Sequence, residues 1–108
     1  MDRGELQTIE GLDLPELEKQ GGRIHYYQEL DAGEFLFILK CLDADGSGID
    51  PDKWPDVIQR FARDGDGKRL FPKAHRERIL KWPATTLVRV IHGMEPMFIT
   101  LADSLKKT

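Results

Sequence analysis

An apolar run of eight residues, FLFILKCL at positions 35–42, constrains the fold more than any other feature, because only Lys40 within it is polar. Asp31 precedes the run, and Glu34 lies three residues after Asp31. This spacing is typical of a capping box, in which two side chains bond reciprocally to the backbone at the start of a helix. The sequence therefore predicts a largely buried helix that begins after Asp31. A buried strand is the alternative for so short a run.

A second helix is expected after the acidic segment that ends at Asp50 and Asp52, because either aspartate can cap it. Pro55 is compatible with the first turn of this helix. Apolar residues then recur at helical spacing on one face: Trp54, Val57, Ile58 and Phe61. The DGDG turn at positions 64–67 is expected to end the helix.

Two prolines indicate where the later helices begin, because proline is favoured at the first helical position. Pro72 is expected to start a helix that runs to Trp82 and directs Ile79 and Leu80 inward. Pro83 is expected to start the last helix.

The N-terminal part has a less regular pattern. Residues 1–22 combine acidic side chains with glycines and one proline, so we expect a weakly ordered acidic arm with at most a short helix at 15–20. Residues 23–30, RIHYYQEL, alternate loosely and indicate a short extended segment. A chain of 108 residues is long enough for one domain. The sequence thus predicts a mainly α protein, with four to five helices in a domain over 23–108.

The last helix carries an apolar stripe whose members are spaced alternately by four and three residues: Leu87, Ile91, Met94, Phe98, Leu101 and Leu105. This spacing is that of a heptad seam. Pro96 lacks an amide donor, so a kink or break is expected near Met94 and Glu95. The stripe predicts a surface for a partner or for self-association. A helix face that packs on its own domain remains the alternative.

Two acidic turns resemble calcium loops at their start. In the first, CLDADGSGIDPDKW at positions 41–54, the early ligand positions hold Asp43, Asp45 and Ser47. Trp54 stands where a calcium loop needs its bidentate glutamate, and Lys68 takes a ligand position in the second turn. Turns that connect helices are therefore the favoured interpretation. An EF-hand-like calcium module that uses the loop from Asp43 to Asp52 remains an alternative function.

The sequence lacks the usual marks of catalysis and of metal binding. Cys41 is the single cysteine and lies in an apolar run, and the three histidines are isolated from one another. Nucleophile elbows and phosphate-binding glycine motifs are absent from the sequence. We therefore expect a protein that is not an enzyme and needs no cofactor.

The charge distribution bears on partners. The formal net charge of −3 argues against a dedicated nucleic-acid binder, although basic residues dominate between Arg60 and Arg89. A small nucleic-acid-binding regulator is kept as a further alternative. No stretch is long and apolar enough for a membrane span, and the N-terminus lacks the apolar core of a signal peptide. A cytoplasmic location without membrane contact is expected.

The order of two longer segments carries a family resemblance. QELDAGEFLFILKCL at positions 28–42 is followed by DGDGKRLFPKAHRERILKWPATTLVRV at positions 64–90. This arrangement resembles the small tail assembly chaperones of long-tailed, siphovirus-like bacteriophages, over about residues 22–95. The sequence departs from the family pattern at Trp82, in the aspartate-rich loop and beyond Glu95.

The resemblance implies a mostly helical protein of the host cytoplasm that is absent from the finished virus particle. Such chaperones bind the tape measure protein, which is long and helical, and help to recruit tail tube subunits around it. The resemblance therefore predicts a non-enzymatic protein whose partners are a tape measure protein and a tail tube protein.

Overall fold

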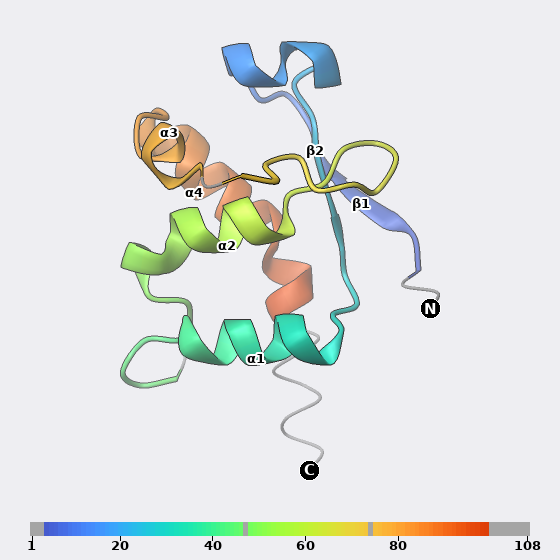
Figure 1. Cartoon of the computed structure of the whole chain (residues 1–108). Coiled ribbons are helices and arrows are strands. Elements are labelled where there is room, and N and C mark those ends of the chain that lie inside the picture. Colours follow the sequence, from blue (N-terminus) through green and yellow to red (C-terminus); the bar gives the residue numbers. More distant parts are fainter. Residues whose placement is uncertain (1–3, 47, 74, 100–108) are drawn as a thin grey trace.

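The computed structural model describes residues 4–46, 48–73 and 75–99. These residues form a mainly α-helical protein with one two-stranded antiparallel sheet (Figure 1). The strands and the 3-10 helices are β1 (Leu6–Ile9), η1 (Pro15–Gln20), β2 (Ile24–Tyr27) and η2 (Pro51–Lys53). The α-helices are α1 (Ala32–Lys40), α2 (Trp54–Phe61), α3 (Arg76–Ile79) and α4 (Ala84–Gly93). Figure 1 shows α1 along one edge of the molecule, with α2 above it.

The N-terminal segment differs from the weakly ordered arm predicted for residues 1–22. Strand β1 pairs with β2, the predicted extended segment, in a register that places Leu6 opposite Tyr27 and Ile9 opposite Ile24. The segment also buries four apolar side chains in the core: Ile9, Leu12, Leu14 and Leu17. A hydrogen bond of 2.9 Å from the Leu12 amide to the Gly22 carbonyl closes the turn around η1. The order of this segment comes from pairing with distant residues, which local composition does not reveal.

Helix α1 begins as the capping-box spacing predicted. The Asp31 carboxylate accepts a 2.8 Å hydrogen bond from the Glu34 amide, and the Glu34 carboxylate accepts one of 3.1 Å from the Asp31 amide. The reciprocal bonds satisfy donors that a helix leaves open at its N-terminus. The alternative of a buried strand is therefore wrong for residues 32–40.

Helix α2 also follows its prediction. Asp50 caps the preceding η2, since its carboxylate accepts a 3.0 Å hydrogen bond from the Asp52 amide. On the predicted apolar face, Val57, Ile58 and Phe61 are buried, and Trp54 is half-buried against them.

Helix α3 is shorter than the helix predicted from Pro72 to Trp82. It begins at Arg76, and in the segment before it the Lys73 carbonyl accepts a 3.1 Å hydrogen bond from Gln59 Nε2. Ile79 is buried as predicted, but Leu80 is 56% exposed. Helix α3 ends at Ile79 after about one turn, and Leu80 is the residue at its C-terminal cap.

Helix α4 starts at Ala84, directly after Pro83, as predicted. It passes so close to β1 that a Cβ atom on Gly93 would lie 2.7 Å from the side chain of Ile9. The helix ends at Gly93, Met94 forms a turn, and residues 95–99 are again helical. The break predicted from Pro96 is confirmed.

Candidate functional site

The described part of the apolar stripe packs on its own chain. Ile91 and Met94 are buried in the core, and Leu87 and Phe98 are partly buried against it. Leu101 and Leu105 lie outside the described residues. These four side chains pack within their own domain, as the intramolecular alternative predicts.

The first acidic loop is held by its own backbone. The Asp43 amide donates a 2.9 Å hydrogen bond to the Gly48 carbonyl, and Leu42 and Ile49 form an antiparallel bridge. Trp54 Nε1 donates to the Ile49 carbonyl at 3.3 Å and so closes the loop where calcium would need a carboxylate. Within residues 4–46, 48–73 and 75–99, no three acidic, histidine or cysteine side chains are grouped to hold a metal ion.

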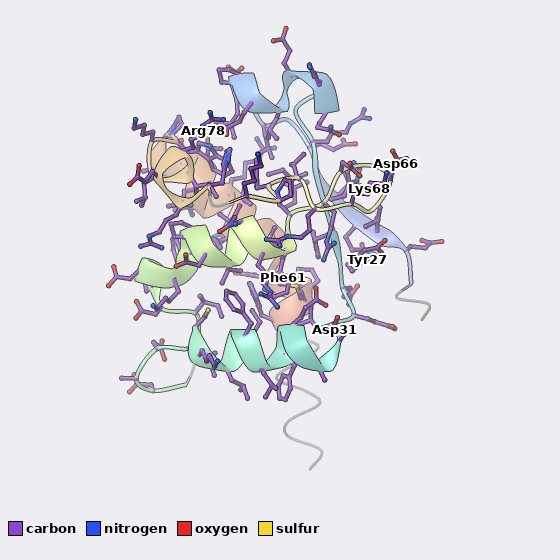
Figure 2. All side chains as sticks on the ribbon, in the orientation of Figure 1. Tyr27, Asp31, Phe61, Asp66, Lys68 and Arg78 are labelled. Atoms are coloured by element: carbon purple, nitrogen blue, oxygen red, sulfur yellow. The ribbon has the colours of Figure 1, made fainter. Side chains whose placement is uncertain are left out.

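The second acidic turn uses its first aspartate structurally. Asp64 Oδ1 accepts hydrogen bonds from the amides of Asp66 at 2.9 Å and Lys68 at 3.0 Å. This arrangement is the local turn chemistry for which aspartate is favoured. Figure 2 shows Asp66 and Lys68 near the tip of the resulting loop.

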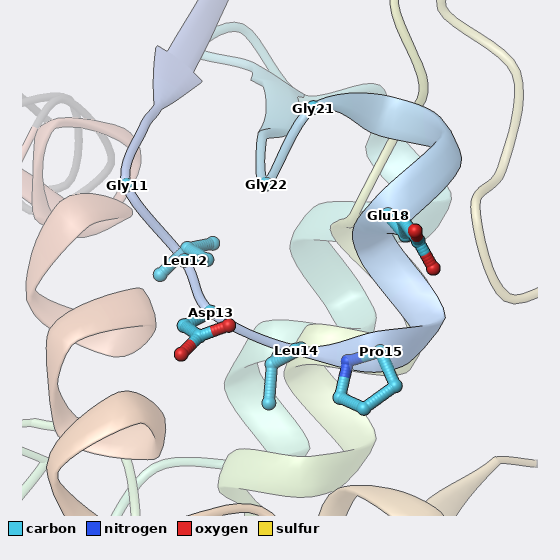
Figure 3. A pocket seen from close by; sticks show the side chains of 8 residues that line it. All are labelled: Gly11, Leu12, Asp13, Leu14, Pro15, Glu18, Gly21 and Gly22. Atoms are coloured by element: carbon cyan, nitrogen blue, oxygen red, sulfur yellow. The ribbon is translucent and has the colours of Figure 1, made fainter.

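A hollow inside the turn around η1 is lined by few polar side chains. Figure 3 shows that it is framed by the backbone from Gly11 to Gly22, with Asp13 and Glu18 on opposite sides. Three of its lining residues are glycines, which offer no side chains. Polar groups do not converge here as they do in ligand pockets.

Helix α1 exposes apolar side chains on its outer face. Leu36 is 56% exposed and Leu39 is 39% exposed, although the sequence predicted a largely buried helix. Phe35 is half-buried beside them. The inner face buries Ile38 and, unusually, the charged Glu34. Since Leu36 and Leu39 are three positions apart, they are neighbours on the helix surface.

A buried ion pair fixes the inner face of α1. Arg63 Nη2 lies 3.2 Å from Glu34 Oε2, and the two side chains are 15% and 7% exposed. The Arg63 guanidinium also lies over the Tyr27 ring, 5.7 Å from its centroid. Since Glu34 also caps α1, the pair connects the start of this helix to the segment that follows α2.

A groove of about 420 Å³ runs between α1 and α2. Its residues come from both helices and from the segments that flank them: Phe37, Lys40, Cys41, Lys53, Asp56, Gln59, Arg60 and Arg69. The Phe37 ring meets Phe61 edge-on, with 5.9 Å between centroids (Figure 2 shows Phe61). The Arg60 guanidinium lies over Phe37, 4.9 Å from its centroid. The groove therefore combines an apolar floor with a basic rim.

Cys41 contributes a neutral thiol to this groove. Burial raises the pKa of Cys41, and the nearby Asp56 carboxylate raises it further, whereas Lys53 opposes the rise. A thiol with a raised pKa stays protonated at neutral pH and is a poor nucleophile. Cys41 therefore acts as part of the apolar floor.

Comparisons with known proteins give no family assignment. No protein-family model matches the chain, and no curated protein or solved structure is significantly similar to it. Within the part of the chain that the structure describes, no helix has the length and apolar character needed to cross a membrane.

Sequence reasoning missed this surface. The apolar run predicts a core helix, because a short run does not reveal how many of its faces will be covered. The basic residues of the groove are scattered between positions 40 and 69. One signal was available: Lys53 and Arg60 are seven residues apart, about two helical turns, and so share a face.

Proposed function

We propose that this protein is a non-enzymatic assembly chaperone that binds a helical partner through the outer face of α1. The observation that carries the proposal is the pair Leu36 and Leu39, adjacent on one helix and both more than a third exposed. Single exposed apolar residues are normal on protein surfaces, whereas contiguous exposed apolar patches mark sites of protein association. A rigid helix with an exposed apolar face is suited to packing against a second amphipathic helix.

The proposed partner is the tape measure protein of a long-tailed bacteriophage. The support is the resemblance of residues 28–42 and 64–90 to tail assembly chaperones, and the first of these segments contains α1. A long helical protein with apolar faces needs such a cover before its tail tube subunits assemble around it. On this proposal the chain acts in the host cytoplasm, helps to recruit the tail tube protein, and leaves before the particle is complete.

Co-expression tests the proposal. The chain is produced together with a tape measure protein encoded beside it, and the partner's soluble fraction and co-purification are measured. We expect a soluble complex with the natural chain and its loss with Leu36→Asp/Leu39→Asp, because charged side chains would be buried without partners. Since both leucines are exposed, thermal melting of the variant should be nearly unchanged.

A matched control is available elsewhere on the surface. Leu80 and Val88 are 56% and 38% exposed, close to the 56% and 39% of Leu36 and Leu39. Leu80→Asp/Val88→Asp should therefore keep the complex. An insoluble, unbound tape measure protein with the natural chain would refute the chaperone function. Equal loss in both double variants would refute the role of α1.

A further inference from the structure

The groove between α1 and α2 has a charge opposite to that of the whole chain. The formal net charge of the protein is −3. The groove is nevertheless lined by four basic side chains, Lys40, Lys53, Arg60 and Arg69, which are all exposed, and by a single carboxylate, that of Asp56. Clustered charges of one sign in a groove attract ligands of the other sign.

The carboxylate in the groove does not neutralise this charge. Asp56 Oδ2 accepts a hydrogen bond of 2.5 Å from Arg76 Nη1. Arg69 donates to the Gln59 carbonyl at 3.3 Å, which orients its guanidinium without neutralising it. Among residues 4–46, 48–73 and 75–99, none of the four groove cations forms an ion pair. Their charges are therefore available to a ligand.

The basic rim adjoins the exposed apolar face of α1. Lys40 lies three residues after Phe37 and four after Leu36, so its side chain stands between the groove floor and the outer face. A molecule that covers Leu36 and Leu39 would thus meet Lys40 at its edge. The two surfaces form one continuous site with an apolar half and a basic half.

We propose that this groove binds the acidic edge of the partner helix whose apolar face packs on α1. The inference rests on the proposed function for the identity of the partner and adds its chemistry: an amphipathic helix with aspartate or glutamate residues beside its apolar stripe. Arginine and lysine at the rim would form charge-assisted hydrogen bonds to these carboxylates. Such pairs select the partner and its orientation and raise the rate of association.

Other occupants fit the groove less well. Single-stranded nucleic acids bind by stacking bases on exposed aromatic rings, but Phe37 is covered by Arg60 on its face and contacted by Phe61. A second copy of the chain would have to supply free acidic side chains. Two acidic residues of its N-terminal segment already have partners, since Glu10 pairs with Arg23 and Glu16 with His75.

Two synthetic peptides test the inference without the tape measure protein. Both are amphipathic, of about 20 residues so that a helix can form on binding, and have the same leucine face. One has glutamates along the edge of that face, and the other has lysines there. At low salt we expect the full chain to bind the fluorescein-labelled glutamate peptide about tenfold more tightly than the lysine peptide. The difference comes from several ion pairs at the rim of the groove, each of modest strength. The preference should vanish near 1 M salt, where the screening length is about 3 Å.

Charge reversal locates the site. Lys40→Glu/Lys53→Glu should abolish the preference for the glutamate peptide, and both side chains are exposed, so the fold should be retained. The control Lys68→Glu/Lys81→Glu changes the net charge equally at two exposed lysines outside the groove. Figure 2 shows Lys68 on the loop at the other side of the molecule from the end of α1 where Lys40 lies. This control should keep the preference.

Several results would overturn the inference. Equal binding of the two peptides would do so, as would an equal loss of preference in the two charge-reversal variants. Displacement of the glutamate peptide by a tighter-binding DNA or RNA oligonucleotide would assign the groove to nucleic acid. Self-association of the natural chain that Lys40→Glu/Lys53→Glu disrupts would assign it to a second copy. If the complex with the tape measure protein does not form but the preference for the glutamate peptide is retained, only the proposed function is refuted.

Discussion

At the scale of single residues, the ion pair between Glu34 and Arg63 should be sensitive to the loss of one partner. Arg63→Met removes the guanidinium 3.2 Å from a carboxylate that is 7% exposed. Breaking a buried pair removes a counterion from the charge that stays buried, and we expect a loss of about 3 kcal/mol in the free energy of unfolding. Urea denaturation measures this loss.

An exposed ion pair in the same chain provides the control. Arg23 and Glu10 are 3.7 Å apart, with side chains that are 55% and 69% exposed. Arg23→Met should cost less than about 1 kcal/mol, because solvent screens such pairs. Adding Glu34→Gln to Arg63→Met should restore part of the loss, since glutamine can keep the capping box without a buried charge. Equal effects of the two arginine substitutions would contradict the buried role of Arg63.

At the scale of elements, the contact between α4 and β1 depends on Gly93. A methyl group at this position would approach Ile9 to 2.7 Å, closer than a Cβ atom can lie. Gly93→Ala should therefore lower the free energy of unfolding by about 1 kcal/mol, because overpacking outweighs the better helix propensity of alanine. Thermal or urea unfolding tests this expectation.

Helix α1 contains the matched control for this substitution. At Gly33 the nearest atom to an added Cβ is the Asp31 carboxylate at 3.5 Å, an ordinary contact. Gly33→Ala should raise stability by up to about 1 kcal/mol from helix propensity alone. Combining Gly93→Ala with Ile9→Ala should cost less than the sum of the two substitutions, because the small side chain removes the clash. Strict additivity would show that this contact is not the cause.

The sequence correctly predicts the elements whose formation depends on residues close to one another in the chain. The capping box of Asp31 and Glu34, the apolar face of α2 and the break at Met94 each depend on residues within one or two turns. The extended segment near 23–30 was also found, as β2. Strand β1 was missed because its hydrogen bonds and its buried Ile9 depend on β2 and α4, which are distant in the sequence. The outward position of Leu80 was missed because α3 ends early.

At the scale of the whole molecule, the basic groove lies next to the exposed apolar side chains of α1. The acidic N-terminal segment closes over the core at one end, while the basic groove and the exposed leucines lie on and beside α1. The residues of this site do not form a recognisable sequence motif. The sequence could supply the capping box that starts α1, but the groove exists only because α1 and α2 meet side by side through Phe37 and Phe61.

The stability of the whole molecule should also depend on pH, because the buried Cys41 thiol and the buried Tyr26 hydroxyl both titrate. Burial raises the pKa of Cys41 above its ordinary 9.0 and that of Tyr26 above 10.0. Above these ordinary values the unfolded chain releases protons that the folded chain keeps, so the free energy of unfolding falls as pH rises. The stability that both groups contribute is complete below pH 9.0 and decreases above it, by at most about 1.4 kcal/mol per pH unit for each group. Urea unfolding between neutral pH and the alkaline range should show a steeper decrease for the natural chain than for Cys41→Ala, whose decrease should begin only as Tyr26 titrates. An equally steep decrease in Cys41→Ala/Tyr26→Phe would assign the alkaline instability to other groups.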